Sequence, residues 1–237
     1  MTTVGRASRL EWPADADALV AEQRRLGGLT APPWSPPDRP LLVGAAFVAF
    51  LRGQQGPGQP GDRAWVGAVL TEGTRVVAER VVEGVAGATY VPGLLALREG
   101  PMLAAAVEAL PRRPDMLLVD GTGRDHERGA GLALQLGALL DLPSVGVTHR
   151  PLRATGDPPG PARGDSSALL LAGVEVARWI RTVPGARPVV AHAGWRTDAA
   201  VATEVVLRCG GPARTPEPLR QARRVAREHR SAELSRT

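Results

Sequence analysis

The sequence predicts a mixed α/β fold on the basis of three observations. Short, nearly continuous apolar runs alternate with helix-length stretches along most of the chain. The first three predicted strands follow one another as a meander, and the next two are each preceded by a helix. Neighbouring strands of a meander pair antiparallel, whereas strands joined through helices pair in parallel by right-handed crossovers. We therefore predict one sheet that combines three antiparallel strands with parallel strands and is flanked by helices.

The first helix and the first strand are separated by a proline-rich segment. Residues 13–27 are predicted to form a helix that begins at a proline and ends at a glycine pair. The prolines between residues 30 and 40 predict a stiff, extended connector. The run LLVGAAFVAFL at 41–51 is almost continuously apolar, which is typical of a central strand buried on both faces. Residues 52–62 are rich in glycine and proline, so we expect a loop there.

The rest of the chain supplies a hairpin and then helices and strands in alternation. β-branched residues on both sides of a Glu-Gly-Thr turn predict hairpin strands at 64–71 and 75–84. The later elements are a helix ending near 110, a strand at 115–121, a helix at 129–141, a strand at 143–149, two short strands within 168–182, a strand or loop at 188–194, and helices near 198–208 and 216–230. This order is that of a ribonuclease H-like sheet. We expect a single domain over residues 1–237, with a flexible tail from about residue 231.

Composition narrows the possible partners. The 237 residues are 43% hydrophobic, which is enough for a sizeable core. The net charge is +5 and all 29 basic residues are arginine, whose guanidinium matches phosphate oxygens, so a nucleic-acid partner is admissible. A genome-wide compositional bias is an alternative source of the arginines. Cys209 is the only cysteine, which excludes a disulfide framework and a multi-cysteine metal site. Because no run of about 18 apolar residues exists, we expect a cytoplasmic monomer without membrane contact.

Two acidic residues and several histidines are candidates for chemistry. Asp120 ends a predicted strand before the segment GTGRDHERG, where a carboxylate suits a divalent cation, although it could instead turn the loop or cap a helix. Glu99 lies in an apolar helix that we expect to be interrupted at Gly100-Pro101, and it faces either solvent or a site. Two carboxylates that meet would suit metal-assisted phosphodiester hydrolysis. His126, His149 and His192 are either acid–base groups or structural residues.

Several motifs together resemble the endonuclease V family. They occur in the family's order and without large insertions: LEWPADADALVAEQRRL (10–26), YVPGLLALREGP (90–101), DMLLVDGTGRDHERGAGLALQLGALLDLPSVGVTHRPL (115–152), AGWRTDAAVATEVVLRC (193–209) and PEPLRQARRVARE (216–228). The resemblance implies a ribonuclease H-like fold. It also implies magnesium-dependent cleavage on the 3′ side of deoxyinosine in DNA or inosine in RNA.

The resemblance also implies roles for individual residues. Tyr90 matches the family's wedge in a Tyr-x-Pro-Gly turn, and Glu99 and Asp120 match its magnesium ligands. His126 and His149 are the further catalytic candidates. The residues expected to contact the strand come from the turn, the Gly-x-Gly segment and the AGWR segment: Tyr90, Pro92, Gly93, Gly121, Gly123, Trp195 and Arg196.

Other chemical positions depart from the family pattern. The aspartate that ligates the metal falls on Ala46, the lysine after the Gly-Val strand on His149, the histidine of the Pro-Gly-His-Arg segment on Trp195, and a proline on Glu127. Alanine cannot bind a metal, and one unit-charge pair at about 4 Å is worth about 4 kcal/mol at an effective dielectric near 20.

We therefore expect magnesium binding to be weak or absent, which leaves two hypotheses. The chain is an impaired nuclease, or it is a non-catalytic binder of inosine-containing or distorted nucleic acid. Geometrically, we expect Tyr90 to be exposed and Glu99 and Asp120 to meet with His126 nearby. We also expect Ala46 and Trp195 to border one pocket.

Overall fold

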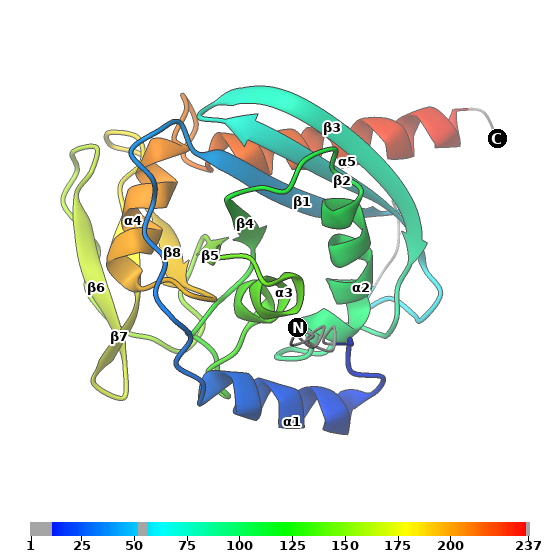
Figure 1. Cartoon of the computed structure of the whole chain (residues 1–237), viewed down its shortest axis with the longest axis horizontal. Helices are drawn as coiled ribbons and strands as arrows, with labels where there is room; N and C mark the ends of the chain where they lie inside the picture. The colour runs from blue at the N-terminus through cyan, green and yellow to red at the C-terminus, as the bar shows by residue number, and fades with distance from the viewer. Residues whose placement is uncertain (1–10, 52–55, 236–237) are drawn as a thin grey trace, which may run out of the picture.

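An eight-stranded mixed sheet forms the centre of the computed structural model, which describes residues 11–51 and 56–235 (Figure 1). The strands span Leu42–Phe50 (β1), Arg63–Glu72 (β2), Arg75–Val85 (β3), Met116–Asp120 (β4), Ser144–Thr148 (β5), Ser166–Leu171 (β6), Val174–Ile180 (β7) and Val189–Ala193 (β8). Their order across the sheet is β3-β2-β1-β4-β5-β8-β7-β6. β1 pairs antiparallel with β2 and parallel with β4, which pairs parallel with β5. The predicted mixed α/β sheet is thus confirmed.

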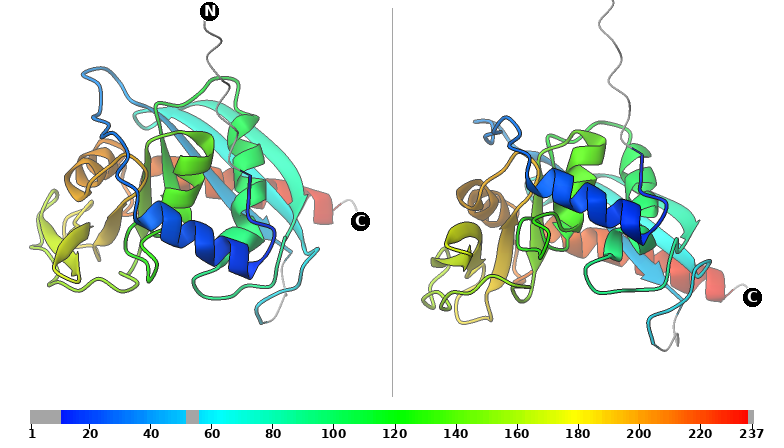
Figure 2. Two further views of the ribbon diagram at one scale, coloured as in Figure 1. Left: turned by 60° about the horizontal axis from the view of Figure 1, so that its bottom comes forward. Right: turned by 90° about the horizontal axis from the view of Figure 1, so that it is seen from below.

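Helices cover both faces of this sheet. They span Ala16–Gly27 (α1), Leu95–Glu108 (α2), Leu132–Leu140 (α3), Ala199–Arg208 (α4) and Glu217–Leu234 (α5). Alternate residues of β1 point to opposite faces, because the side-chain period of a strand is two. Ala46 and Val48 therefore pack toward α2 and α3, and Val43 and Ala45 pack toward α4 and α5. Figure 2 shows α1 lying across α2 and α3, which it contacts.

The structure decides one open alternative and corrects two expectations. The segment at 188–194, expected as a strand or a loop, is a strand, and β8 runs antiparallel to β5, so that it ends beside the start of β5. α2 is not interrupted at Gly100-Pro101 but continues through Pro101. α5 extends to Leu234, so residues 231–234 are helical rather than part of a tail. The first part of the predicted loop, residues 52–55, and the last two residues of the chain lie outside the described residues.

A glycine in β2 sets how closely α5 approaches the sheet. A Cβ added to Gly67 would lie 2.6 Å from the carbonyl oxygen of Ala222 and 2.6 Å from the backbone nitrogen of Ala226. Glycine is therefore needed at this position, because a methyl group would push the helix backbone outward. In the described part of the chain, no helix combines the length and the apolar character needed to span a bilayer.

Candidate functional site

Glu99 and Asp120 come together at the carboxyl ends of the parallel strands. Asp120 is the last residue of β4 and pairs with Val147 of β5, and Glu99 reaches this edge from α2. Burial and, to a smaller extent, the negative charge of Asp120 together raise the pKa of Glu99 to about 7, against the opposing charge of Arg98. The raised pKa is the shift expected for two carboxyl groups that interact electrostatically without a metal between them.

No carboxylate stands at the neighbouring position of β1. Ala46 is the partner of Val119, one residue before Asp120, and it is 6% exposed in the core beneath α2 and α3. Among residues 11–51 and 56–235, no group of three or more histidine, cysteine, aspartate or glutamate side chains could hold a metal ion. This corner therefore presents Glu99 and Asp120 without the third carboxylate that the family resemblance places on β1.

The side chain that faces Asp120 is an arginine. Arg223 Nη2 lies 2.8 Å from Asp120 Oδ2, in an ion pair whose two side chains are 27% and 38% exposed. The Arg223 guanidinium lies over the ring of Phe47, 5.0 Å from its centroid, and its Nε is buried without a hydrogen-bond partner. Arg223 is not among the site residues expected from the sequence. A signal was present, because Arg223 lies four residues after Leu219 and three before Ala226, on the buried stripe of α5.

His149 belongs to the same corner of the sheet. It directly follows β5 and its Nε2 lies 3.3 Å from Thr215 Oγ1. Burial lowers the pKa of His149, the positive charges of Arg214 and Arg223 lower it further, and Asp120 opposes them. Asp120, His149, Arg214 and Arg223 thus interact electrostatically at one corner, which we call the Asp120 corner.

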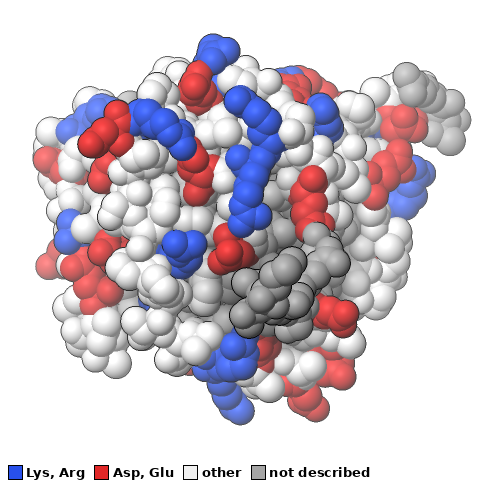
Figure 3. Space-filling view, viewed as in Figure 1, with Lys and Arg blue, Asp and Glu red and all other residues white. Residues whose placement is uncertain are grey.

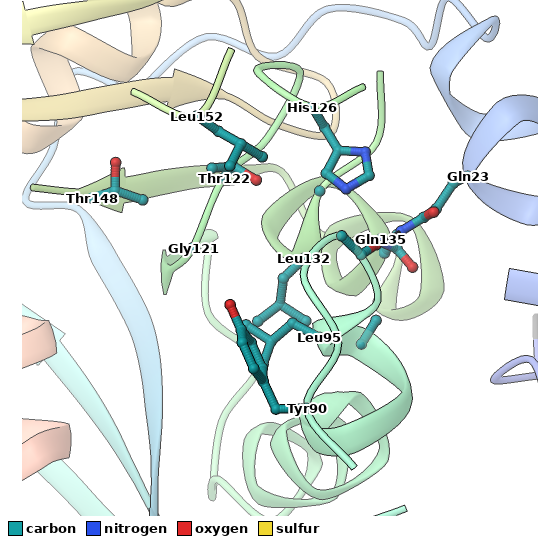
Figure 4. A pocket seen from close by; sticks show the side chains of 13 residues that line it. Gln23, Tyr90, Leu95, Gly121, Thr122, His126, Leu132, Gln135, Thr148 and Leu152 are labelled. Atoms are coloured by element: carbon teal, nitrogen blue, oxygen red, sulfur yellow. Dashed lines mark hydrogen bonds between the residues drawn. The ribbon is translucent and has the colours of Figure 1, made fainter. Parts of the chain in front are cut away.

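A pocket opens beside Tyr90, with a cavity volume of about 160 Å³. Tyr90 is 45% exposed in the loop between β3 and α2, as expected for a residue that contacts a ligand rather than closing the core. Figure 4 shows Tyr90 beside Leu95 and Leu132, with His126 and Leu152 on the opposite side. Further lining comes from Gly121, Thr122, Thr148 and Gln135. The cavity thus combines apolar walls with a few polar groups, as small-ligand sites do.

The turn that carries Tyr90 is held in place by hydrogen bonds to the backbone of Gly93. Gly93 has φ +80°, which glycine adopts without strain, and its carbonyl oxygen accepts hydrogen bonds from Gln23 Nε2 at 2.9 Å and Arg128 Nη2 at 3.0 Å. Burial lowers the pKa of His126, and a hydrogen bond to the Gly93 backbone opposes the shift. His126 therefore braces the turn. The charges that act on it belong to Glu127, Arg128 and Asp125.

Trp195 and Arg196 lie at the opposite end of the sheet. The backbone nitrogen of Trp195 donates to Ser144 Oγ at 2.9 Å, and the nitrogen of Ser144 donates to the Trp195 carbonyl at 3.0 Å. Ser144 precedes Val147 by three residues, which is about 10 Å along a strand. Trp195 packs against α1 and α3, and Arg196 Nε donates to the carbonyl oxygen of Pro32 in the connector.

The expectation that Ala46 and Trp195 border one pocket is therefore wrong. The reason is the antiparallel direction of β8, which carries the residues after it to the amino-terminal end of β5.

The two glycines that follow Asp120 in the Gly-x-Gly segment have different roles. Gly121 lines the pocket, whereas a Cβ on Gly123 would lie 1.9 Å from the Ala193 carbonyl oxygen, so Gly123 serves close packing.

A second group missed from the sequence supports the pocket wall. Asp125 is fully buried and accepts backbone N–H bonds from Leu152, Arg153 and Ala154 at 2.7–2.8 Å. His192, also fully buried, has its Nδ1 3.6 Å from Asp125 Oδ2 and its Nε2 2.8 Å from Thr148 Oγ1. Burial lowers the pKa of His192 to about 4, so the ring is neutral near pH 7. This histidine therefore contacts Thr148 and Asp125, and it is Asp125 that holds Leu152.

Positive charge does not form one broad field on the surface seen in Figure 3, where arginines and carboxylates are interspersed. On α5 the arginines also have different partners. Arg220 pairs with Glu217, and Arg224 pairs with Glu79 and Glu228, all on the surface. Arg223 instead pairs with Asp120 at the end of β4.

Comparison with known proteins gives a consistent result. The sequence profile of the family described as Endonuclease V matches residues 39–224. An endonuclease V of Rhodospirillum centenum is 38% identical over 225 residues, 93% of this chain and 90% of that protein. The crystal structure of endonuclease V from Streptomyces avermitilis is 34% identical with a TM-score of 0.83, over 94% of this chain and 96% of that chain. These matches confirm the ribonuclease H-like fold. The endonuclease V of Ciona intestinalis, crystallised with a 24mer DNA containing an inosine, shares the fold at 19% identity and a TM-score of 0.73, over 91% of this chain and 98% of that chain.

Proposed function

This chain belongs to the endonuclease V family of nucleic-acid endonucleases, and we propose that it binds inosine-containing DNA or RNA while its magnesium-dependent cleavage is impaired. The observation that carries the proposal is that β1 offers no carboxylate beside Asp120. Ala46, where the family resemblance places the metal-binding aspartate, is buried toward α2 and α3, and the next residue, Phe47, lies on the α5 face against the Arg223 that pairs with Asp120. The rest of the family's architecture is retained around it.

Binding is supported by the pocket beside Tyr90. The Tyr90 ring is 45% exposed at the edge of an apolar cavity, and three hydrogen-bonding side chains hold the turn beneath it. An aromatic ring held in this way can stack on a base, which is worth about 1–3 kcal/mol per base. The Ciona intestinalis relative binds DNA that contains inosine, which supports the same base as the ligand here.

Impaired cleavage is supported by the carboxylate that is missing beside Asp120. A missing carboxylate ligand removes at least the interaction of one charge pair, about 4 kcal/mol, which corresponds to roughly a thousandfold in metal affinity. No other carboxylate of the described residues completes a metal-binding group at this corner. We therefore expect cleavage at a rate far below that of relatives that retain the aspartate, or none at all, in which case the protein acts as a binder.

Two measurements test this function. The first is the dissociation constant of short strands that differ only in inosine or adenosine, for the wild type, Tyr90→Ala and Val91→Ala. Val91 is the matched control because it lies in the same turn and is also 45% exposed. We expect the wild type to prefer inosine, Tyr90→Ala to lose about tenfold in affinity, as one stacked base would cost, and Val91→Ala to retain it.

The second measurement is single-turnover cleavage of the same strands with magnesium or manganese. We expect little or no product from the wild type. Robust cleavage that disappears in Asp120→Ala would show that another group completes the metal site, and the proposed impairment would then be wrong.

A further inference from the structure

We propose that the Asp120 corner is a metal-independent phosphate site, in which the guanidinium of Arg223 supplies the positive charge beside Asp120 and contacts a backbone phosphate of the bound strand. This inference rests on the proposed function, because it takes a nucleic acid as the ligand. It goes beyond that function by assigning the phosphate contact to a side chain of this chain rather than to a bound ion.

The hydrogen-bonding capacity of Arg223 supports the proposal. A guanidinium carries five N–H donors in a planar fork and bonds phosphate or carboxylate oxygens two at a time. Asp120 Oδ2 accepts one of these bonds, from Nη2. The Nε of Arg223 is buried and has no partner within the described residues, so a ligand must be bound by the terminal nitrogens of this partly exposed side chain.

The position of the guanidinium is fixed before any ligand arrives. Asp120 holds one edge of the group and the ring of Phe47 lies against its face, 5.0 Å away. The side chain is 27% exposed, so the group is partly open to solvent. A charge that is held in place and partly desolvated binds an oxyanion without paying the ordering entropy of a free arginine.

The charges of the corner favour an anion over a cation. Arg227 lies over the same Phe47 ring at 5.7 Å, and Arg214 acts on His149 together with Arg223. Arg223 and Arg227 thus place two guanidinium groups against the Phe47 ring, and the first of them pairs with the Asp120 carboxylate. A divalent cation is repelled by such a group of charges, and a phosphodiester is attracted to it.

Calorimetry of magnesium binding tests, without any nucleic acid, whether the Arg223 guanidinium takes the place of a bound cation. The proteins are the wild type, Phe47→Asp, Arg223→Gln and the double variant, because Phe47 is the β1 residue next to Asp120 on the face that carries Arg223. We expect no binding at millimolar magnesium for the wild type, weak binding for each single variant, and an affinity at least about tenfold higher for the double variant, because the two changes act on one site. Equal affinities for Phe47→Asp and the double variant would show that Arg223 does not occupy the place of the cation.

The salt dependence of strand binding tests the phosphate contact. In EDTA, the slope of log Kd against log salt should decrease by about 0.7 in Arg223→Gln, which is the contribution of one phosphate contact on a single strand. Arg223→Lys keeps the charge and should keep the slope. Arg220→Gln is the matched control, one turn earlier on α5 and paired with Glu217, and it should also keep the slope. The change should be the same for inosine and adenosine strands.

The outcomes separate this inference from the proposed function. An unchanged slope in Arg223→Gln, or strand binding by the wild type that requires magnesium, would overturn the phosphate site and leave inosine recognition intact. Equal affinity of the wild type for inosine and adenosine strands would refute the proposed function, whereas the effect of Arg223→Gln on the slope would still be readable. Absence of binding to either strand would refute both.

Discussion

Asp125 holds the wall of the Tyr90 pocket from beneath, and replacing it with alanine tests how that wall is supported. The carboxylate accepts backbone N–H bonds from Leu152, Arg153 and Ala154, and Leu152 lines the pocket. Asp125→Ala removes the acceptor from all three donors. We expect the segment that carries Leu152 to loosen, so that both stability and the preference for inosine decrease.

The size of the effect follows from burial. A buried polar group left without a partner costs about 1–3 kcal/mol. The bond to Ala154 is fully buried, whereas the other two are part-buried. Water can therefore replace some of the hydrogen bonding that the Leu152 and Arg153 N–H groups lose. We therefore expect a loss of about 4 kcal/mol in the free energy of unfolding, or about 8–16 °C in Tm for a domain of this length. Asp125→Asn keeps one oxygen, the Oδ1 that accepts two of the bonds, and should cost about half as much.

Thermal and urea unfolding measure these losses. Asp15→Ala is the control, because Asp15 also accepts a backbone N–H, from Ala18 at 2.8 Å, but on the exposed surface as the N-cap of α1. That change should cost about 1 kcal/mol. A loss below about 1 kcal/mol in Asp125→Ala would refute the reasoning, since three donors would then have found other partners at no cost.

Two other predictions concern residues away from the Asp120 corner. His192 should make the fold acid-sensitive: its pKa is lowered from 6.5 to about 4, so the unfolded chain takes up the proton first and stability is lost as the pH falls from about 6.5 toward about 4. Urea unfolding across this range should show the loss in the wild type and a smaller one in His192→Gln. Trp195→Ala should lower the free energy of unfolding by about 2–4 kcal/mol, because the indole packs against α1 and α3. It should leave the Kd for an inosine strand unchanged, and a weaker Kd would show that the indole reaches the strand.

The sequence predicts the sheet well because its strands are unusually apolar. β1, β4 and β5 are buried on both faces, and such runs are readable without knowledge of their neighbours. The approach of Glu99 and Asp120 also follows from topology, since Asp120 ends a parallel strand and Glu99 lies on the preceding crossover helix. These predictions need only the order of elements.

The sequence predictions that fail are those that depend on the direction of a strand or on the rotation of a helix about its own axis. The segment 188–194 could be read as a strand or a loop, so the end of the sheet at which Trp195 emerges could not be predicted. Arg223 could not be singled out from the sequence for a different reason. α5 contains several arginines, and which of them points inward depends on how the helix is rotated against the sheet. Its spacing from Leu219 and Ala226 places it on the buried stripe, and that spacing was the available signal.

Because α5 lies so close to β2, a substitution at Gly67 would alter the Asp120 corner indirectly, by moving the helix that carries Arg223. Gly67 lies under Ala222 and Ala226, the residues that flank Arg223 along the helix, yet it contacts neither Asp120 nor Arg223 in any hydrogen bond or ion pair of the described residues. A methyl group there would have to lift the helix backbone, because its carbon would lie 2.6 Å from two backbone atoms. Small residues under a helix can therefore adjust the separation of an ion pair at another point of the same helix–sheet interface, so that variation in the chemistry of a site need not appear among the residues that form it.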